Sequence, residues 1–307
     1  MGQYSAFYGR NLEVNREAIR MLYRFSPLRY PGGKGKLAEY IQAIFIENNL
    51  NDGHYVEPYA GGAGVALALL FMENASHIHI NDLNTGVYAF WFSILNDTEN
   101  FFRKLHDTEV TVDQWFKQRQ VLRNLQDHSK TEIGFATFFL NRTNRSGIIN
   151  AGMIGGNGQT GNWKIDARYN KKDLLERIER IVDFKNRISV YNMDACQLIN
   201  EIQPNLPKKT LIYFDPPYYK KGSGLYENHY ESDDHSQIGK FIQTQVQRPW
   251  VVSYDNVDPI RNIYKYRRQK IYNIGYSVRN VYNGSEVLVY SDNISIPNIE
   301  NPLKISA

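Results

Sequence analysis

The chain has 307 residues and a formal net charge of +4 at pH 7, and this length allows one large domain or two modest ones. No stretch approaches the roughly 20 apolar residues of a membrane span, and we expect no secretory signal because the N-terminal segment lacks an apolar run. The one cysteine excludes an internal disulfide and a cysteine-based metal cluster. We therefore expect a cytoplasmic protein with no membrane partner and no metal.

Short apolar, β-rich segments alternate with helical patterns along most of the chain. The first block predicts strands at residues 54–58 and 77–81, followed by helices at residues 63–73 and about 85–95. The second block predicts strands at residues 187–192, 210–214, 250–254, 268–276 and 286–291. This alternation is typical of an α/β, Rossmann-like, doubly wound sheet whose ligand sites lie at the carboxyl ends of the strands.

The last two predicted strands flank Asn283–Gly284, a turn signal that favours an antiparallel C-terminal hairpin. Between the two blocks, residues 96–185 are helical and polar in pattern, and basic residues outnumber acidic ones, which favours a polyanion partner. We predict a discontinuous catalytic domain, residues 25–95 and 186–293, that carries this mainly helical block as an inserted recognition domain. Residues 1–24 form an extension to which the sequence assigns no role.

The tetrapeptide Asp215–Tyr218, Asp-Pro-Pro-Tyr, follows the most apolar of the predicted strands. Two prolines end a strand because neither donates a backbone hydrogen bond. The segment then presents a carboxylate, a proline carbonyl and an aromatic ring together. Asp215 and the Pro216 carbonyl are suited to accept hydrogen bonds from an exocyclic amine, and Tyr218 is suited to stack on the plane of the base.

A glycine-rich turn, residues 57–64, follows the first predicted strand and opens a helix. Glycines there allow a ligand to approach the backbone, and the helix start offers free N–H groups. The spacing is not that of the usual dinucleotide fingerprint. Glu57 precedes the turn, and Asp82 ends the next strand about 20 residues later, as a ribose-binding acid should. Asp194 lies at the same predicted edge and is a candidate for binding the base of a nucleoside ligand.

Residues 28–36 combine a proline turn, three glycines and two lysines before a helix, without the P-loop pattern. Lys34 on such a turn is suited to meet a ligand carboxylate, although a solvated basic loop fits equally well. His77 and His79 face one side of a strand, and we predict a structural role for them because nothing nearby completes a metal shell. Cys196 is predicted to be a packed side chain.

The helical block contains a cluster of arginine, asparagine and hydroxyl side chains at residues 141–147, followed by a glycine-rich loop at residues 148–161. Arginine and asparagine are the usual readers of guanine and adenine edges. The block is therefore predicted to contact DNA. The candidate contacts are Asn141, Arg142, Asn144, Arg145, Ser146 and Asn150.

Together these motifs resemble those of the Dam-like DNA N6-adenine methyltransferases. The segments that carry the resemblance are residues 30–34, 56–64, 81–82, 139–147, 192–194, 215–218 and 250–255. Their order, with cofactor motifs first, the recognition insert next and the catalytic tetrapeptide last, is also that of the family. The resemblance covers residues 25–293 approximately.

The resemblance implies S-adenosyl-L-methionine as the cofactor, and extrusion of the target base from the duplex. It implies catalytic roles for Asp215, Pro216 and Tyr218. The implied cofactor contacts are Tyr30, Lys34, Glu57, Pro58, Tyr59, Gly61, Gly62, Gly64, Asp82, Asp194 and Asp215.

The sequence thus predicts an enzyme that methylates the N6 amine of adenine in a specific double-stranded DNA sequence by direct transfer. The expected partners are double-stranded DNA and, in function, a cognate restriction endonuclease; the enzyme is expected to be a monomer or weak dimer. Two alternatives stay open: a methyltransferase acting on RNA or on a protein amide, and a DNA-binding protein that lacks catalysis. Asp215 argues against a protein-amide target, where asparagine usually stands at this position, and the intact Asp215 and glycine turn argue against a protein that lacks catalysis.

Overall fold

The computed structural model describes residues 25–29, 34–219, 230–276 and 282–303. Its strands form one seven-stranded sheet with the order β3-β2-β1-β4-β5-β7-β6. β1 to β5 are parallel, β7 runs antiparallel to β5, and β6 runs antiparallel to β7. The strands are β1 (Gly53–Glu57), β2 (Ala75–Asn81), β3 (Ile188–Tyr191), β4 (Thr210–Phe214), β5 (Trp250–Asp255), β6 (Arg268–Tyr276) and β7 (Tyr282–Tyr290). The predicted doubly wound sheet with an antiparallel C-terminal hairpin is confirmed.

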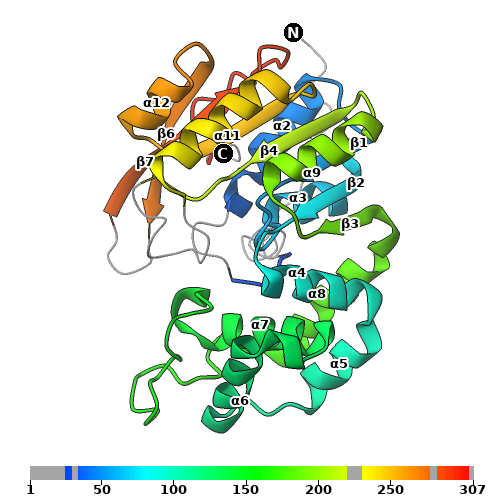
Figure 1. Ribbon diagram of the computed structural model, residues 1–307, viewed down its shortest axis with the longest axis vertical. Coiled ribbons are helices and arrows are strands. Elements are labelled where there is room, and N and C mark those ends of the chain that lie inside the picture. The colour runs from blue at the N-terminus through cyan, green and yellow to red at the C-terminus, as the bar shows by residue number, and fades with distance from the viewer. Residues whose placement is uncertain (1–24, 30–33, 220–229, 277–281, 304–307) are drawn as a thin grey trace, which may run out of the picture.

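Helices flank this sheet and form a separate layer beyond its β3 side, at the bottom of Figure 1. Those of the sheet region are η1 (Lys34–Leu37), α2 (Ala38–Glu47), α3 (Gly64–Phe71), α4 (Thr85–Asn96), α9 (Ala195–Ile202), α11 (Ser232–Gln245) and α12 (Asp258–Ile263). Those of the block between β2 and β3 are α5 (Thr98–Asp107), α6 (Val112–Arg123), α7 (Lys130–Thr143), η3 (Arg145–Gly147) and α8 (Lys171–Asp183).

Alternation along the strands divides the core between the two faces of the sheet. On one face, Tyr55 and Leu211 pack in a cluster with α2 and α3. On the other face, Val56, Ile212 and Phe214 pack against α9 and α11, which lie over the sheet in Figure 1. Every residue of β4 is buried, as is usual for a central parallel strand covered on both faces.

The helical block shares its core with the sheet region through α4. Phe90 of α4 stacks on Phe138 of α7 with ring centroids 5.7 Å apart. Phe101 of α5 meets both rings edge-on, at 5.7 Å from each. All three rings belong to the cluster that also fills the α2 and α3 face of the sheet. One continuous apolar core therefore holds the block at a fixed place beside the sheet.

The C-terminal hairpin differs from its prediction in where it turns. Asn283 and Gly284 were expected in the turn, but they lie in β7 and pair with Gly275 and Ile274 of β6. The strands pair as far as Tyr276 and Tyr282, so the pairing includes both residues of the predicted turn. A glycine preceded by asparagine is compatible with extended backbone when the partner strand continues to pair with it.

His77 and His79, which were predicted to have a structural role, lie beside a third histidine. His54 of β1 lies beside His77 and His79 of β2, and His54 Nδ1 is 3.0 Å from His79 Nε2. Two further ring nitrogens meet hydroxyls, with His77 Nε2 2.8 Å from Ser189 Oγ and His79 Nδ1 3.1 Å from the Tyr191 hydroxyl. Within the described residues no cluster of this kind has the arrangement of a metal site.

The three imidazoles resist protonation. Burial lowers the pKa of His54 and His77, and burial together with the two neighbouring rings lowers the pKa of His79 to about 3. The unfolded chain takes up protons on these rings near pH 6.5, whereas the folded chain does not. Stability that is complete above this pH is therefore lost as the pH falls.

Replacing His79 by phenylalanine should flatten this pH dependence. We expect a lower melting temperature at pH 8, because the two hydrogen bonds of the imidazole are lost, but a smaller further decrease between pH 7 and pH 5. For the native His79 the decrease amounts to about 1.4 kcal/mol per pH unit below its unfolded pKa. Thermal unfolding across this range measures the effect, with exposed His106→Gln as the control. An unchanged slope in His79→Phe would exclude the cluster as its source.

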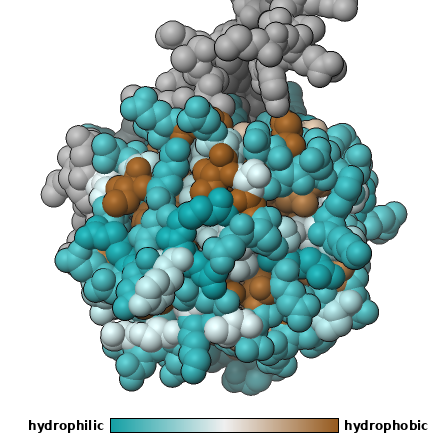
Figure 2. Space-filling model, turned by 90° about the horizontal axis from the view of Figure 1, so that it is seen from above, coloured by the Kyte–Doolittle hydropathy of each residue, from teal (hydrophilic) through white to brown (hydrophobic). Residues whose placement is uncertain are grey.

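Hydrophobic side chains on the outer end of the sheet region occur as separate patches among hydrophilic ones, as Figure 2 shows. Ile46 of α2, 46% exposed, is an example of a large apolar side chain at the described surface. None of the helices that the structure describes combines the length and the apolar character needed to cross a bilayer.

Candidate active site

Two of the predicted motifs follow neighbouring strands. β1 and β4 pair in parallel, with Tyr55 opposite Leu211 and Val56 opposite Ile212. The strand order reverses between β1 and β4, and ligands of doubly wound sheets bind at such a switch point, outside the carboxyl ends. The glycine turn that follows β1 and the tetrapeptide Asp215–Tyr218 that follows β4 therefore meet where a ligand is expected.

The glycine turn is held from two sides. Gly61 donates its N–H to Asp82 Oδ2 at 2.9 Å and accepts a bond from the Trp91 indole at 2.9 Å. Gly61 and Ala63 have φ of 48°, the left-handed conformation that lets the chain reverse into α3 at Gly64. The turn and the N–H groups at the start of α3, which have no partner within the helix, form a cradle for a polar ligand.

Glu57 supports this cradle from beneath. It is buried, and its Oε1 accepts bonds from the Ala66 N–H at 3.1 Å and the Tyr55 hydroxyl at 3.0 Å. Burial raises the pKa of Glu57 to about 8, against the effect of these two bonds and with a further contribution from Asp215. The carboxyl group thus anchors the first turn of α3, and its predicted contact with a cofactor remains a prediction.

Asp82 has both oxygens engaged by the backbone. Oδ2 binds Gly61, as above, and Oδ1 accepts the N–H of Asn84 at 2.9 Å. Burial raises the pKa of Asp82 to about 6, and the two backbone bonds oppose this rise. The group is therefore a carboxylate at neutral pH, placed on the glycine turn as the sequence predicted.

Asn81, which has no assigned role in the sequence analysis, braces three strand ends. Its Nδ2 donates to the carbonyls of Pro58 and Met193, each at 2.9 Å, and its Oδ1 accepts the Met193 N–H at 2.9 Å. Asn192 continues the brace, because its Nδ2 donates to the Asp82 carbonyl at 2.8 Å. These amides fix the spacing of the turns after β1, β2 and β3.

Asp194 follows β3 and is exposed. Its Oδ1 caps α9 by accepting the N–H groups of Cys196 at 2.9 Å and Gln197 at 3.2 Å. Cys196 is partly buried, and burial raises the pKa of its thiol to about 11, which agrees with a packed side chain. Asp194 lies at the same carboxyl edge as the glycine turn, so its predicted contact with a nucleoside base remains open to test.

Tyr59 is turned toward the α11 side of the sheet. Its hydroxyl lies 2.8 Å from that of Tyr230, and the two rings meet edge-on. Pro58 and Gly62 are buried within the turn. Tyr30 lies outside the described residues. The structure therefore brings the remaining predicted cofactor residues of the sheet region to one edge.

Asp215 lies at the mouth of β4 with 23% of its side chain exposed. Its Oδ1 accepts the hydroxyl of Ser253, 2.6 Å away, and faces Lys34 Nζ at 3.5 Å. Burial raises the pKa of Asp215 to about 6, while Lys34 and Ser253 oppose the rise. The N–H of Tyr219 donates to Asp255 Oδ1 at 2.9 Å, which holds the end of the tetrapeptide.

Lys34 is buried and contacts groups from both ends of the chain. Its Nζ donates to Glu286 Oε1 and to the Tyr218 hydroxyl, each at 2.8 Å. Burial lowers the pKa of Lys34, but the charges of Asp215 and Glu286 outweigh burial and raise it well above its usual value. Lys34 is therefore an ammonium group within the protein, and its contact with a cofactor carboxylate remains a prediction.

Glu286 of β7 was not identified from the sequence, yet it receives more bonds than any predicted site residue just described. Oε1 accepts from Lys34 and, at 2.7 Å, from Tyr218, while Oε2 accepts from the Tyr272 hydroxyl. Burial raises the pKa of Glu286, but Lys34 and the three bonds outweigh it, so the net pKa is lowered. Glu286 is an ionised carboxylate.

Tyr218 is held in place through its hydroxyl. The ring is 3% exposed, and the hydroxyl is part of the bond network between Lys34 and Glu286. The network therefore fixes the orientation of the tetrapeptide through the hydroxyl. Stacking of this ring on a base remains a prediction.

Two of the predicted DNA contacts are occupied within the fold. Asn144 is fully buried, with Oδ1 accepting the Trp115 indole N–H at 2.6 Å and Nδ2 donating to the carbonyls of Ile148 and Ile149. Asn141 is 2% exposed and exchanges two bonds of 2.7 Å with the backbone of Arg29. Both donors of each amide are used internally, and direct readout of bases by Asn141 or Asn144 remains a prediction that would need these bonds to be exchanged.

The other predicted contacts surround a tight turn. Gly147 has φ of 75°, and a Cβ there would lie 2.4 Å from the Arg29 carbonyl, so the turn needs glycine. Arg142 is partly buried and donates to the Arg168 carbonyl at 2.7 Å. Burial lowers the pKa of Arg142 to about 9. Arg145 and Asn150 are exposed and Ser146 is half-exposed, so these remain candidates for DNA contact.

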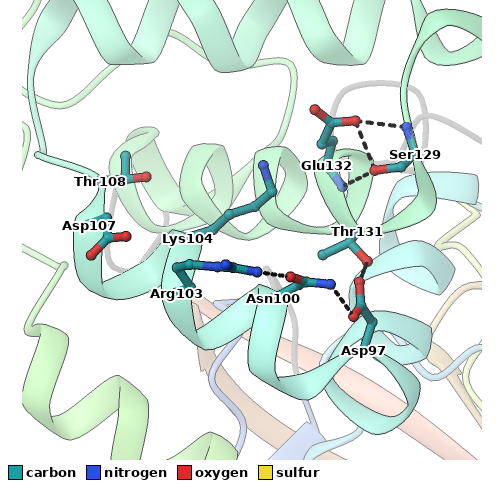
Figure 3. A pocket seen from close by; sticks show the side chains of 9 residues that line it. All are labelled: Asp97, Asn100, Arg103, Lys104, Asp107, Thr108, Ser129, Thr131 and Glu132. Atoms are coloured by element: carbon teal, nitrogen blue, oxygen red, sulfur yellow. Dashed lines mark hydrogen bonds between the residues drawn. The ribbon is translucent and has the colours of Figure 1, made fainter.

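A polar recess in the helical block lies apart from these motifs (Figure 3). Within it, Asp97 accepts bonds from Asn100 and Thr131, and Ser129 and Glu132 form a capping box at the start of α7. These side chains bond mainly to one another. The recess therefore supports the helix junction and is not part of the site at the sheet edge.

A doubly wound sheet with an acidic glycine turn after β1 and an Asp-Pro-Pro-Tyr segment after β4 defines an S-adenosylmethionine-dependent methyltransferase that acts on an amine. The residues fit this cofactor, because Asp82 holds the left-handed turn that leads directly into the start of α3, where the first N–H groups have no partner within the helix. Residues 30–279 match the family model for D12 class N6 adenine-specific DNA methyltransferases, and the chain belongs to this family.

Two relatives illustrate the range of similarity. The Type II methyltransferase M.MjaIII of Methanocaldococcus jannaschii is 22% identical over 228 residues, which are 69% of this chain and 76% of that protein. The rRNA methyltransferase AviRa of Streptomyces viridochromogenes matches with a TM-score of 0.37 and 11% identity, covering 85% of this chain and 86% of that one.

Replacing Asp82 by alanine should weaken binding of S-adenosylmethionine. The change removes the bonds that hold Gly61 and Asn84, and loss of such charge-assisted bonds typically costs about 1.5–3 kcal/mol, or roughly 10- to 150-fold in the dissociation constant. Calorimetric titration measures it, with the exposed Glu47→Ala as the charge-matched control. Cofactor affinity equal to that of the wild type would remove Asp82 from the site.

Substitutions at Asn144 and Arg145 should have different effects. Asn144→Ala leaves the buried Trp115 N–H without its acceptor, and we expect a loss of about 1–3 kcal/mol in the free energy of unfolding. Arg145→Ala should leave stability unchanged and weaken DNA binding by about 1–3 kcal/mol. Denaturant unfolding and DNA titration separate the two. Unchanged stability with altered DNA recognition in Asn144→Ala would support the predicted readout by this amide.

Proposed function

We propose that the protein transfers a methyl group from S-adenosylmethionine to the N6 amine of adenine within a specific double-stranded DNA sequence, with the target base turned out of the duplex. The observation that carries the proposal is the state of Asp215. Within the described residues, its hydrogen bonds fall on Oδ1, the side chain stays partly exposed, and the group is ionised at neutral pH.

The adenine amine is a weak nucleophile because its lone pair is delocalised into the ring. Asp215 Oδ2 and the Pro216 carbonyl are two acceptors at the mouth of β4, next to the glycine turn. Hydrogen bonds to both amine protons favour a tetrahedral nitrogen and return the lone pair to it. When bound, the cofactor supplies an electrophilic methyl group; Asp215 and Pro216 orient the nitrogen toward it, so positioning and electrostatics are the main contributions.

The helical block is the proposed site of target recognition. Its exposed turn at Arg145, the exposed Asn150 and the exposed Trp163 lie together along residues 145–168, where Arg168 also faces the Trp163 ring at 5.5 Å. Basic and aromatic side chains in combination suit contact with phosphates and bases. Because M.MjaIII is named a Type II methyltransferase, a cognate restriction endonuclease is the proposed functional partner.

Expression in a host that lacks adenine methylation, followed by base-resolved mapping of its genome, tests the function. We expect N6-methyladenine at one recurrent sequence. The purified protein should label duplex DNA and not RNA when S-adenosylmethionine is the donor. Labelling of RNA alone would favour the alternative substrate, and no labelling of any nucleic acid would reject the proposal.

Asp215→Ala should lower the rate of methyl transfer by at least about 10²–10³-fold, the typical effect of removing one preorganised polar partner of a transition state. The fold should persist, because Lys34 retains Glu286 and Ser253 retains the Tyr213 hydroxyl, 2.7 Å away. Single-turnover rates and thermal unfolding measure the two effects. Near wild-type turnover in a folded variant would show that Asp215 does not serve the amine.

A further inference from the structure

One buried cation stands between two carboxylates that come from different parts of the chain. Lys34 of η1 lies 2.8 Å from Glu286 Oε1 and 3.5 Å from Asp215 Oδ1. The side chains of Lys34 and Glu286 are 3% and 0% exposed, so solvent does little to screen either charge. The Lys34 ammonium is therefore closer to Glu286, the more deeply buried carboxylate, than to Asp215.

We propose that Glu286 is a positioning residue for methyl transfer: it holds the Lys34 ammonium away from Asp215 and so keeps Asp215 available as a hydrogen-bond acceptor for the substrate amine. The inference rests on the proposed function. Glu286 does not touch the reacting atoms in this scheme; it acts through Lys34.

The hydrogen bonds of Glu286 explain how it can hold the ammonium. Tyr218 donates to Oε1 and Tyr272 to Oε2, so hydroxyls from the tetrapeptide and from β6 fix the carboxylate on both sides. The Tyr218 hydroxyl also accepts from Lys34. Each of the three groups is oriented by the other two, and the ammonium has a defined place that is closer to Glu286 than to Asp215.

The alternatives show why both charges matter. Without Glu286, the nearest remaining carboxylate for the buried ammonium is Asp215, and a direct ion pair would compete with the amine for the acceptor. Without Lys34, Asp215 and Glu286 would repel each other, and like charges in one site raise the pKa of one partner. The network therefore keeps Asp215 ionised and leaves it able to accept a hydrogen bond from the substrate amine.

The charges near Asp215 come from several elements. Lys34, Glu286 and Tyr213 all interact electrostatically with Asp215. Tyr272 of β6 donates a hydrogen bond to Glu286, the carboxylate that Lys34 also contacts. The other titratable groups that interact electrostatically with Asp215 are Tyr55, Glu57 and Tyr254. Among these described groups Lys34 is the one cation, so changes at Lys34 and Glu286 should dominate the titration of Asp215.

Opposite shifts of the pH–rate profile test the proposal. The single-turnover rate of the wild type should fall on the acid side near pH 6, where Asp215 is protonated. Glu286→Gln should move this acid limb to lower pH, because the ammonium then pairs with Asp215, and should lower the rate at pH 8. Lys34→Met should move the limb to higher pH. Each shift should be about one pH unit, since a charge within ~4–6 Å typically moves a pKa by about 1–3 units.

A buried hydrogen bond on the same strand provides the matched control. The hydroxyls of Tyr290 and Tyr40 lie 2.7 Å apart in the core, away from Lys34. Tyr290→Phe should lower the melting temperature and leave the acid limb in place. If Glu286 has only a structural role, Glu286→Gln should likewise lower the melting temperature and leave the acid limb in place, and that result would overturn the proposal. A shift of the acid limb of Glu286→Gln to higher pH, as expected for Lys34→Met, would also overturn it.

Either single variant leaves one charged partner of a buried ion pair behind and can fail to fold. The double variant Lys34→Met, Glu286→Leu avoids this problem, because replacing both partners of a buried ion pair by apolar groups often leaves the stability of the fold unchanged or increases it. If Glu286 acts only through Lys34, the double variant should be as fast as Lys34→Met alone, within about threefold. A much slower double variant would overturn the inference. A wild-type protein that methylates no DNA would instead reject the proposed function, and this inference with it.

Discussion

The parallel pairing of β1 with β4 is the constraint on which the site depends. It places the ends of two strands that are more than 150 residues apart in sequence next to each other at the point where the strand order reverses. The glycine turn and the Asp-Pro-Pro-Tyr segment can meet only because these strands are in register. Burial of both faces of β4 makes that register costly to change, since a slip of one residue would disrupt close packing against the helices on both faces.

Side-chain amides and one buried cation convert this sheet edge into a defined site. Asn81 holds the turns after β1 and β3, and Asn144 holds the turn that presents Arg145. Lys34 links the start of the described chain to β7 through Glu286. Loop segments that carry function need such supports, because they have little core of their own.

Sequence patterns predicted the parts of this arrangement that local order determines. Apolar strand runs, the turn residues around Gly61 and the tetrapeptide at Asp215 are all short-range signals, and each lies at the edge where it was expected. Glu286 gave no such signal, because its partner Lys34 is 252 residues away and the strand around it reads as an ordinary one. The bracing role of Asn144 was not predicted, because an asparagine that braces a turn and one that reads a base look the same in sequence. The turn was predicted at Asn283–Gly284 from this local turn signal, but the two strands pair past these residues.

The shared core of α4 and α7 has a consequence for how such enzymes can change specificity. Recognition blocks that are joined to a catalytic domain by linkers can be exchanged as cassettes. Here Phe90 and Phe138 stack across the boundary, and Phe101 closes the contact from α5. A block transplanted from a relative would have to bring a matching aromatic surface or leave a cavity in a core that also supports the sheet. On the proposed role of this block in target recognition, new target sequences are easier to reach through the exposed turn and loop of residues 145–168 than through replacement of the block as a whole.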